Sequence, residues 1–243
     1  MPLRRPRHIF YAFLTLAAAL LASQAAQAAP TGLLNDTGQT LCSDGTTLVA
    51  CDATSTGDAA TYPRQDGRFG RDVGNPPKVG GGAAGFDFTR VCMSGDLAGA
   101  GTCAPSPTAA ADQSNPGVTD WACTKDNVTN LIWSLQTQSA NWTTASGATY
   151  PNAGHNSLTR CGYGTGWRLP TRQELLSIVN WANSAMTIDL AYFPAAQATD
   201  HWTSDVYVLN PTIHAWFVTF NQGSTSTRFM PNTLVVRLVR SGP

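Results

Sequence analysis

Histidines are the side chains of this sequence best suited to acid–base chemistry near neutral pH. The chain has four, of which His155, His201 and His214 follow the N-terminal leader described below. None stands in a catalytic pattern, because the sequence has no His-Glu-x-x-His, no Gly-x-Ser-x-Gly and no Walker lysine. We therefore expect no catalytic residues and no enzyme, and we expect His201, beside Trp202, to pack rather than act as a base.

Two further segments carry residue types that bind phosphates or cations. Gly80–Gly85 fits G-x-G-x-x-G by letter, but no strand is expected before it and no helix after it, which favours a loop. Asp66 and Asp72 flank a glycine turn, yet a calcium loop needs denser oxygen ligands. Three arginines are also interleaved there: Arg64, Arg68 and Arg71. We expect no metal and no cofactor.

Six cysteines carry the remaining chemistry. An even number behind an export signal predicts a disulfide framework, and the chain has no C-x-x-C pair typical of zinc. Six cysteines allow many pairings. Neighbours in sequence favour three: Cys42–Cys51, Cys92–Cys103 and Cys123–Cys161.

The first 28 residues have the features of a secretory signal peptide. Arg4, Arg5 and Arg7 precede an apolar run, and Ala26-Gln27-Ala28 is a small-x-small cleavage site. We expect an exported protein, in the periplasm, on the cell surface or secreted, and no later segment is apolar for long enough to span a membrane.

Composition divides the exported part at residue 115. Residues 29–115 are rich in Gly, Ala, Thr, Asp and Pro, which predicts a loop-rich, disulfide-stapled arm; residues 116–243 hold the tryptophans and form the second region. Without the leader arginines the chain has 12 basic and 15 acidic residues, so it lacks the basic surface of a nucleic-acid binder.

The apolar pattern predicts an α+β fold. A capping box of Thr171 and Glu174 begins a helix over 171–184, with Leu175, Ile178, Val179 and Ala182 on one face. The arm is expected to hold a hairpin of residues 40–42 and 46–51. The other strands are expected at 86–92, 130–137, 201–208, 215–221 and 234–240.

The block "GWRLPTRQEL" begins before that helix and includes its first residues. We expect Trp167 to fill the core and Arg168 to pair with a carboxylate or with backbone carbonyls, so that the motif is structural. Its members are Trp167, Arg168, Leu169, Pro170, Thr171 and Glu174.

This block resembles the domain at the C-terminus of Legionella collagen-like protein, a bacterial family of exported domains. Other blocks resemble it in the same order: "TGQT", "QDGRFG", "GFDFT", "WACTKDNVTNLIW", "YFP", "HWTS", "AWFVTFNQG" and "VRLVR". Asn130 stands where the family usually has Gly, and Asn tolerates the left-handed backbone that this turn requires. "RLPT" with its helix is also similar to formylglycine-generating-type domains, but the late catalytic cysteines of those enzymes are missing.

Both resemblances imply a C-type-lectin-like fold, and the named family member is associated with adhesion and sulfated glycans. The resemblance implies an exported, non-catalytic binding module for a glycan or a surface protein. The alternative is a structural or accessory subunit of a cell-surface assembly, with the arm docking to a neighbour.

We expect binding to fall on two polar segments between predicted strands, 205–214 and 221–233, because loops on a rigid scaffold carry recognition residues. Ordinary solvated loops are the alternative. Trp216, Val218 and Phe220 alternate and are assigned to the core. The candidate ligand-binding residues are Asp205, Tyr207, Asn210, His214, Asn221, Arg228 and Phe229.

Overall fold

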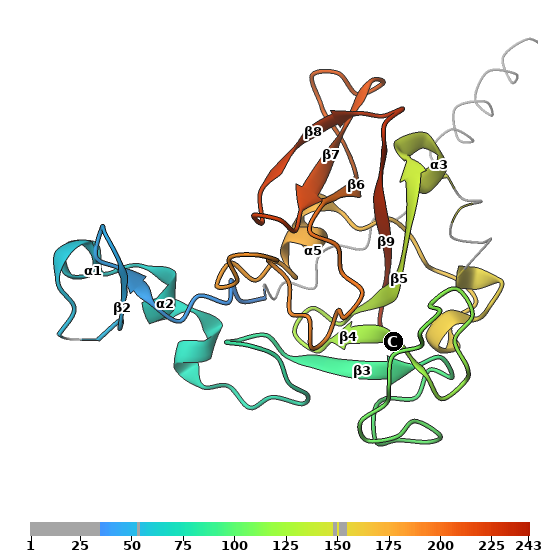
Figure 1. Cartoon of the computed structure of the whole chain (residues 1–243), viewed down its shortest axis with the longest axis horizontal. Coiled ribbons are helices and arrows are strands. Elements are labelled where there is room, and N and C mark those ends of the chain that lie inside the picture. The colour runs from blue at the N-terminus through green and yellow to red at the C-terminus, as the bar shows by residue number, and fades with distance from the viewer. Residues whose placement is uncertain (1–34, 53, 148–149, 151–154) are drawn as a thin grey trace, which may run out of the picture.

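The computed structural model describes residues 35–52, 54–147, 150 and 155–243. The expected signal peptide, residues 1–28, lies outside them. The described chain is mostly sheet with a few short helices (Figure 1). In order, the elements are β1 (Cys42–Ser43), β2 (Leu48–Val49), α1 (Gly57–Thr61), α2 (Asp66–Phe69), η1 (Arg71–Gly74), β3 (Phe88–Cys92), β4 (Trp121–Asp126), β5 (Leu131–Asn141), α3 (Trp142–Ser146), η3 (Arg160–Gly162), α5 (Arg172–Leu176), β6 (Asp200–Val206), β7 (His214–Thr219), β8 (Thr225–Phe229) and β9 (Thr233–Ser241).

A seven-stranded sheet in the order β3-β4-β5-β9-β6-β7-β8 is the centre of the fold. All its neighbours are antiparallel except β9 and β6, which pair in parallel. β3 belongs to this sheet, so the sheet crosses the position 115/116 at which composition divides the chain.

The inner strands of the sheet are buried on both faces over much of their length. Along β7, Ala215 and Phe217 pack in one apolar cluster while Val218 packs in another. The central strand β9 divides in the same way, with Leu238 in the first cluster and Val239 in the second. Strands covered on both faces do not show a clean alternation of apolar and polar residues.

The arm holds the small hairpin, β1 paired with β2, and its segment with β1, β2, α1 and α2 extends away from the large sheet in Figure 1. Its strands are shorter than the expected 40–42 and 46–51. The turn between them is built by Asp44, whose carboxylate Oδ1 accepts the N–H groups of Thr46 at 2.8 Å and Thr47 at 2.7 Å. Gly80–Gly85 is loop, as expected, and Gly81 forms a bridge to Phe88 at the start of β3.

Three disulfides are present, at the pairings that sequence neighbours favour: Cys42–Cys51, Cys92–Cys103 and Cys123–Cys161. Cys123 on β4 and Cys161 in η3 are both fully buried. Their bond joins the sheet to the segment that leads into the "GWRLPT" block.

Two expected elements differ from the structure. The helix expected over 171–184 ends at Leu176, because Asn180 and Trp181 turn away to bond with the carbonyls of Thr187 and Thr37. Leu175, Ile178 and Val179 are buried as the helical pattern predicts, but Ala182 is exposed.

The second difference is β8, a strand within the segment 221–233 that we expected to be a loop. Its sequence, Thr-Ser-Thr-Arg-Phe, is polar, but threonine and phenylalanine favour extended backbone. Gly223, with φ of +67°, makes the turn between β7 and β8. Asn130 also has the left-handed backbone expected of it, with φ of 56°.

Candidate functional site

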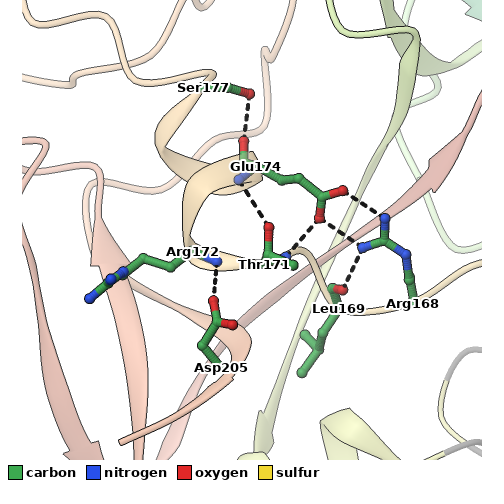
Figure 2. A network of polar contacts seen from close by, with 7 residues as sticks. All are labelled: Arg168, Leu169, Thr171, Arg172, Glu174, Ser177 and Asp205. Atoms are coloured by element: carbon green, nitrogen blue, oxygen red, sulfur yellow. Dashed lines mark hydrogen bonds and ion pairs between the residues drawn. The ribbon is translucent and has the colours of Figure 1, made fainter. Parts of the chain in front are cut away.

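The "GWRLPT" block forms a corner held by one ion pair. Arg168 donates Nη1 to Glu174 Oε2 at 2.8 Å and Nη2 to Glu174 Oε1 at 2.7 Å, and Nη1 also bonds to the Leu169 carbonyl (Figure 2). Glu174 in turn accepts the backbone N–H of Thr171, which completes the capping box. Burial alone would raise the pKa of Glu174, but the hydrogen bonds and charge of Arg168 outweigh it and hold this pKa below its ordinary value.

Backbone bonds fix this corner to the sheet. Arg168 exchanges two hydrogen bonds with Val239 of β9, at 3.0 and 2.9 Å, and Ser204 of β6 donates its N–H to the Pro170 carbonyl. Trp167 is 4% exposed and packs in the core cluster of β7 residues Ala215 and Phe217. The block therefore supports the scaffold, and its charged groups are occupied by one another.

Thr171→Ala is expected to lower the free energy of unfolding by about 1 kcal/mol, the usual loss of a side-chain helix cap. The Thr171 hydroxyl accepts the N–H of Glu174 at 3.2 Å. Chemical denaturation measures the change, with Thr212→Ala as the control because Thr212 is exposed in the β6–β7 loop. If the two variants unfold alike, the capping box contributes nothing to stability.

A row of aromatic and basic side chains lies on one face of β7 and β8, with one member just after β6, outside that corner. The Arg172 guanidinium lies 4.2 Å from the ring centre of Trp216, and the Tyr207 ring meets Trp216 edge-on at 5.8 Å. Further along the same face, the ring centres of His214 and Phe229 lie 5.9 Å apart. We call these five residues the aromatic row.

Strand geometry explains why the row is continuous. His214 and Trp216 are two positions apart on β7, so they share a face. Tyr207 donates its N–H to the His214 carbonyl, and Phe229 is the register partner of His214 on β8. The first turn of α5 carries Arg172 over this face, and Asp205 holds that turn by accepting the N–H of Arg172 (Figure 2).

The assignment of Trp216 to the core was wrong. Val218 and Phe220 are fully buried, but Trp216 is only half-buried. The alternation of Trp216, Val218 and Phe220 suggested that β7 buries only the face that carries them. The strand also buries Ala215 and Phe217 on its other face. Trp216 is the third residue of β7, and the Arg172 guanidinium lies over its ring.

Exposed aliphatic side chains lie at the end of the β6–β7 hairpin, next to the aromatic row. Val208 is 80% exposed and Leu209 is 73% exposed, with Val206 and Ile213 at 39% and 41%. We call these four residues the apolar tip. Single exposed apolar residues are ordinary, but neighbouring ones often mark interaction surfaces.

The candidate ligand-binding residues divide among several places. Tyr207, His214 and Phe229 meet in the aromatic row. Asn210 lies in the hairpin turn, where its carbonyl accepts the N–H groups of Ile213 and His214. Asp205 holds the start of α5, so its carboxylate serves the scaffold.

Asn221 and Arg228 lie apart from the row. Asn221 follows the far end of β7, away from the hairpin turn. Arg228 points to the opposite face of the sheet, where it pairs with Asp200 and lies 5.1 Å from the ring centre of Phe217. The structure brings Arg172 and Trp216 to the row in their place. No sequence signal indicated Arg172, because its position depends on where α5 packs.

Two histidines lie in the core. His201 is fully buried, donates Nδ1–H to the Thr199 carbonyl at 2.8 Å and meets Phe220 edge-on at 4.7 Å. Burial lowers its pKa to about 3, and the nearby Arg237 acts in the same direction. Burial also lowers the pKa of His155 to about 3, assisted by Arg160. Both rings are neutral at pH 7.

The described residues contain no group of three or more His, Cys, Asp or Glu side chains placed to hold a metal ion. None of the helices in the described ranges is both long enough and apolar enough to cross a membrane.

The fold and the "GWRLPT" corner define a mostly β-sheet module with a few short helices and three disulfides. The family model for the Lcl C-terminal domain matches residues 122–240. The matched residues begin within β4 and end within β9, so this part of the chain is similar to the Lcl C-terminal domain family. No curated protein matches the chain.

Proposed function

We propose that this protein is an exported, non-catalytic recognition module that binds a partner through the aromatic row and the apolar tip. The exposure of Val208 and Leu209 beside half-buried rings supports this most directly. The match of residues 122–240 to the Lcl C-terminal domain family is consistent with a surface-associated module. Three disulfides fit a protein that folds in an oxidising compartment outside the cytoplasm.

The proposal includes a C-type-lectin-like fold for the domain, as the family resemblance implies. It also gives the "GWRLPT" corner the role of positioning α5, and thereby Arg172, beside the sheet. The ion pair of Arg168 and Glu174 is internal to that corner and is not part of the binding surface.

A protein partner fits this surface better than a glycan. Sugars stack on open aromatic ring faces, but the guanidinium of Arg172 already occupies one face of Trp216. The aliphatic tip offers contact area without hydrogen-bonding groups, and apolar contact area of this kind fills pockets on a protein surface. A glycan carrying acidic groups is the rival, because Arg172 could bind such a group.

Binding of the exported chain to intact cells separates these classes. Pretreating the cells with protease is expected to abolish binding, whereas glycosidase treatment is expected to have little effect. The chain is expected to bind weakly, if at all, to an array of neutral and sulfated glycans. If the chain still binds protease-treated cells and also binds glycans on the array, its partner is a glycan and not a protein.

Tyr207→Ala tests the surface itself. Loss of one aromatic anchor typically costs about 2 kcal/mol of binding free energy, roughly a thirtyfold weaker complex. Tyr62→Ala is the matched control, since Tyr62 is a 63% exposed tyrosine on the arm. If Tyr62→Ala weakens binding and Tyr207→Ala does not, the partner binds the arm and this assignment is wrong.

A further inference from the structure

The strand β8 forms one edge of the large sheet, and its hydrogen-bond pattern shows which groups face outward. Met230 donates to the Ile213 carbonyl and Thr219 donates to the Ser224 carbonyl. Hydrogen-bonded pairs alternate along an antiparallel ladder, so Arg228 and Ser226 also direct their backbone groups to β7. The N–H and C=O groups of Thr225, Thr227 and Phe229 therefore point away from the sheet.

These outward groups are largely unpaired. The Phe229 carbonyl accepts the N–H of Asn232. Within the described chain, the outward N–H and C=O groups of Thr225 and Thr227 have no hydrogen-bond partner. The opposite edge of the sheet differs. There the outer side of β3 is covered by its own chain, with bridges from Gly81 to Phe88 and from Val91 to Leu97.

β8 also lacks the features by which proteins block an open edge. It contains no proline and no lysine, and its pairing with β7 has no bulge, unlike that of β6 with β7. Its single charge, Arg228, is neutralised by Asp200 and turned onto the ring of Phe217. The strand is thus an open template for a further strand.

We propose that this template is filled by β8 of a second copy of the chain, in an antiparallel pair with a two-fold axis at Thr227. The strand is complementary to itself in this register. Thr227 opposes Thr227 of the partner subunit, a favourable pairing of threonines across strands. Thr225 opposes the partner's Phe229, and Arg228 opposes the partner's Ser226, so like charges do not meet.

The outward groups satisfy one another in this arrangement. The two copies of Thr227 lie at positions that exchange N–H and C=O bonds, and Phe229 N–H reaches the partner's Thr225 carbonyl. The sheets of the two copies become continuous, and the faces that carry Trp216 and Phe229 lie side by side. Because the edge is only five residues long, the interface is small and the association is weak, with a dissociation constant roughly in the micromolar range.

Sedimentation of the exported chain over a range of concentrations tests the pairing, using Thr227→Lys and Thr227→Glu. Each variant alone brings like charges together at the two-fold axis and is expected to self-associate at least tenfold more weakly than the parent. An equimolar mixture of the two variants brings opposite charges together and is expected to recover the dimer.

Thr233→Lys is the control, because Thr233 is an exposed residue of β9, a strand inside the sheet. This variant is expected to leave the dimer unchanged. Circular dichroism establishes that each variant is folded. A parent chain that stays monomeric at high concentration overturns the proposal. So does a dimer that Thr227→Lys leaves intact, or a mixture that stays monomeric. This test requires no ligand, so its failure leaves the recognition surface standing.

Discussion

Lowering the pH from 6 to 4 is expected to reduce the free energy of unfolding by about 3 kcal/mol, the net result of a loss through two core histidines and a smaller gain through Asp126. His155 and His201 each have a folded pKa of about 3, far below the ordinary value of 6.5. Between these values the unfolded chain binds a proton at each histidine and the folded chain does not. Stability from each is therefore complete above pH 6.5 and is lost as the pH falls.

Asp126 acts in the opposite direction. Burial raises its folded pKa to about 6 from 3.8, although hydrogen bonds from Thr129 and Val128 oppose this. Between pH 3.8 and 6 the folded chain holds a proton there that the unfolded chain does not, so Asp126 favours folding as the pH falls. The two histidines and the one aspartate together make the free energy of unfolding fall by about 1.4 kcal/mol for each unit by which the pH is lowered.

Two variants separate these contributions. His201→Asn keeps a donor for the Thr199 carbonyl but removes the titrating ring, and is expected to make stability nearly independent of pH between 4 and 6. Asp126→Asn is expected to make the slope about twice as steep. Denaturant unfolding at several pH values gives all three slopes; equal slopes would mean that neither residue titrates as its burial requires.

Replacing Cys123 and Cys161 by alanine together is expected to cost roughly 3–4 kcal/mol of stability. Their disulfide spans a sequence separation of 38 and joins β4 to η3, both sides being fully buried. Closing so long a loop removes much of the conformational entropy of the unfolded chain. Loss of the bond also loosens the segment that leads into Trp167 and the "GWRLPT" corner.

The matched control is Cys42→Ala with Cys51→Ala. That disulfide has a sequence separation of 9 and staples only the β1–β2 hairpin of the arm. Its removal is expected to leave the cooperative unfolding of the large sheet unchanged. Equal losses from the two double variants would show that the arm and the sheet unfold as one unit.

Local chemistry was readable from sequence where one short segment contains all the interacting parts. The capping box of Thr171 and Glu174 is such a case, because its hydrogen bonds join residues three apart. Arg168 was expected to pair with a carboxylate or with backbone carbonyls; it does both, with Glu174 six residues on and with the Leu169 carbonyl. Neighbouring cysteines likewise paired as their spacing favours.

Features that depend on distant packing were not readable. The helix ends at Leu176 because a carbonyl at Thr37, far away in sequence, takes the N–H of Trp181. β8 was missed because an exposed edge strand carries polar side chains on both faces and looks like a loop. The aromatic row joins Arg172 from α5 to rings on β7, on β8 and just after β6, so only the packing of α5 on β7 brings Arg172 to it.

The central claim is that recognition belongs to the aromatic row and not to the arm or the "GWRLPT" corner. The most direct measurement is a binding titration on intact cells with the double variant Tyr207→Ala/Phe229→Ala against Tyr62→Ala/Phe69→Ala. The second pair consists of one tyrosine and one phenylalanine, 63% and 67% exposed on the arm. We predict that the first double variant, still folded by circular dichroism, binds at least thirtyfold more weakly, a loss of about 2 kcal/mol, while the second binds like the parent. Parent-like binding by the first double variant would contradict the claim.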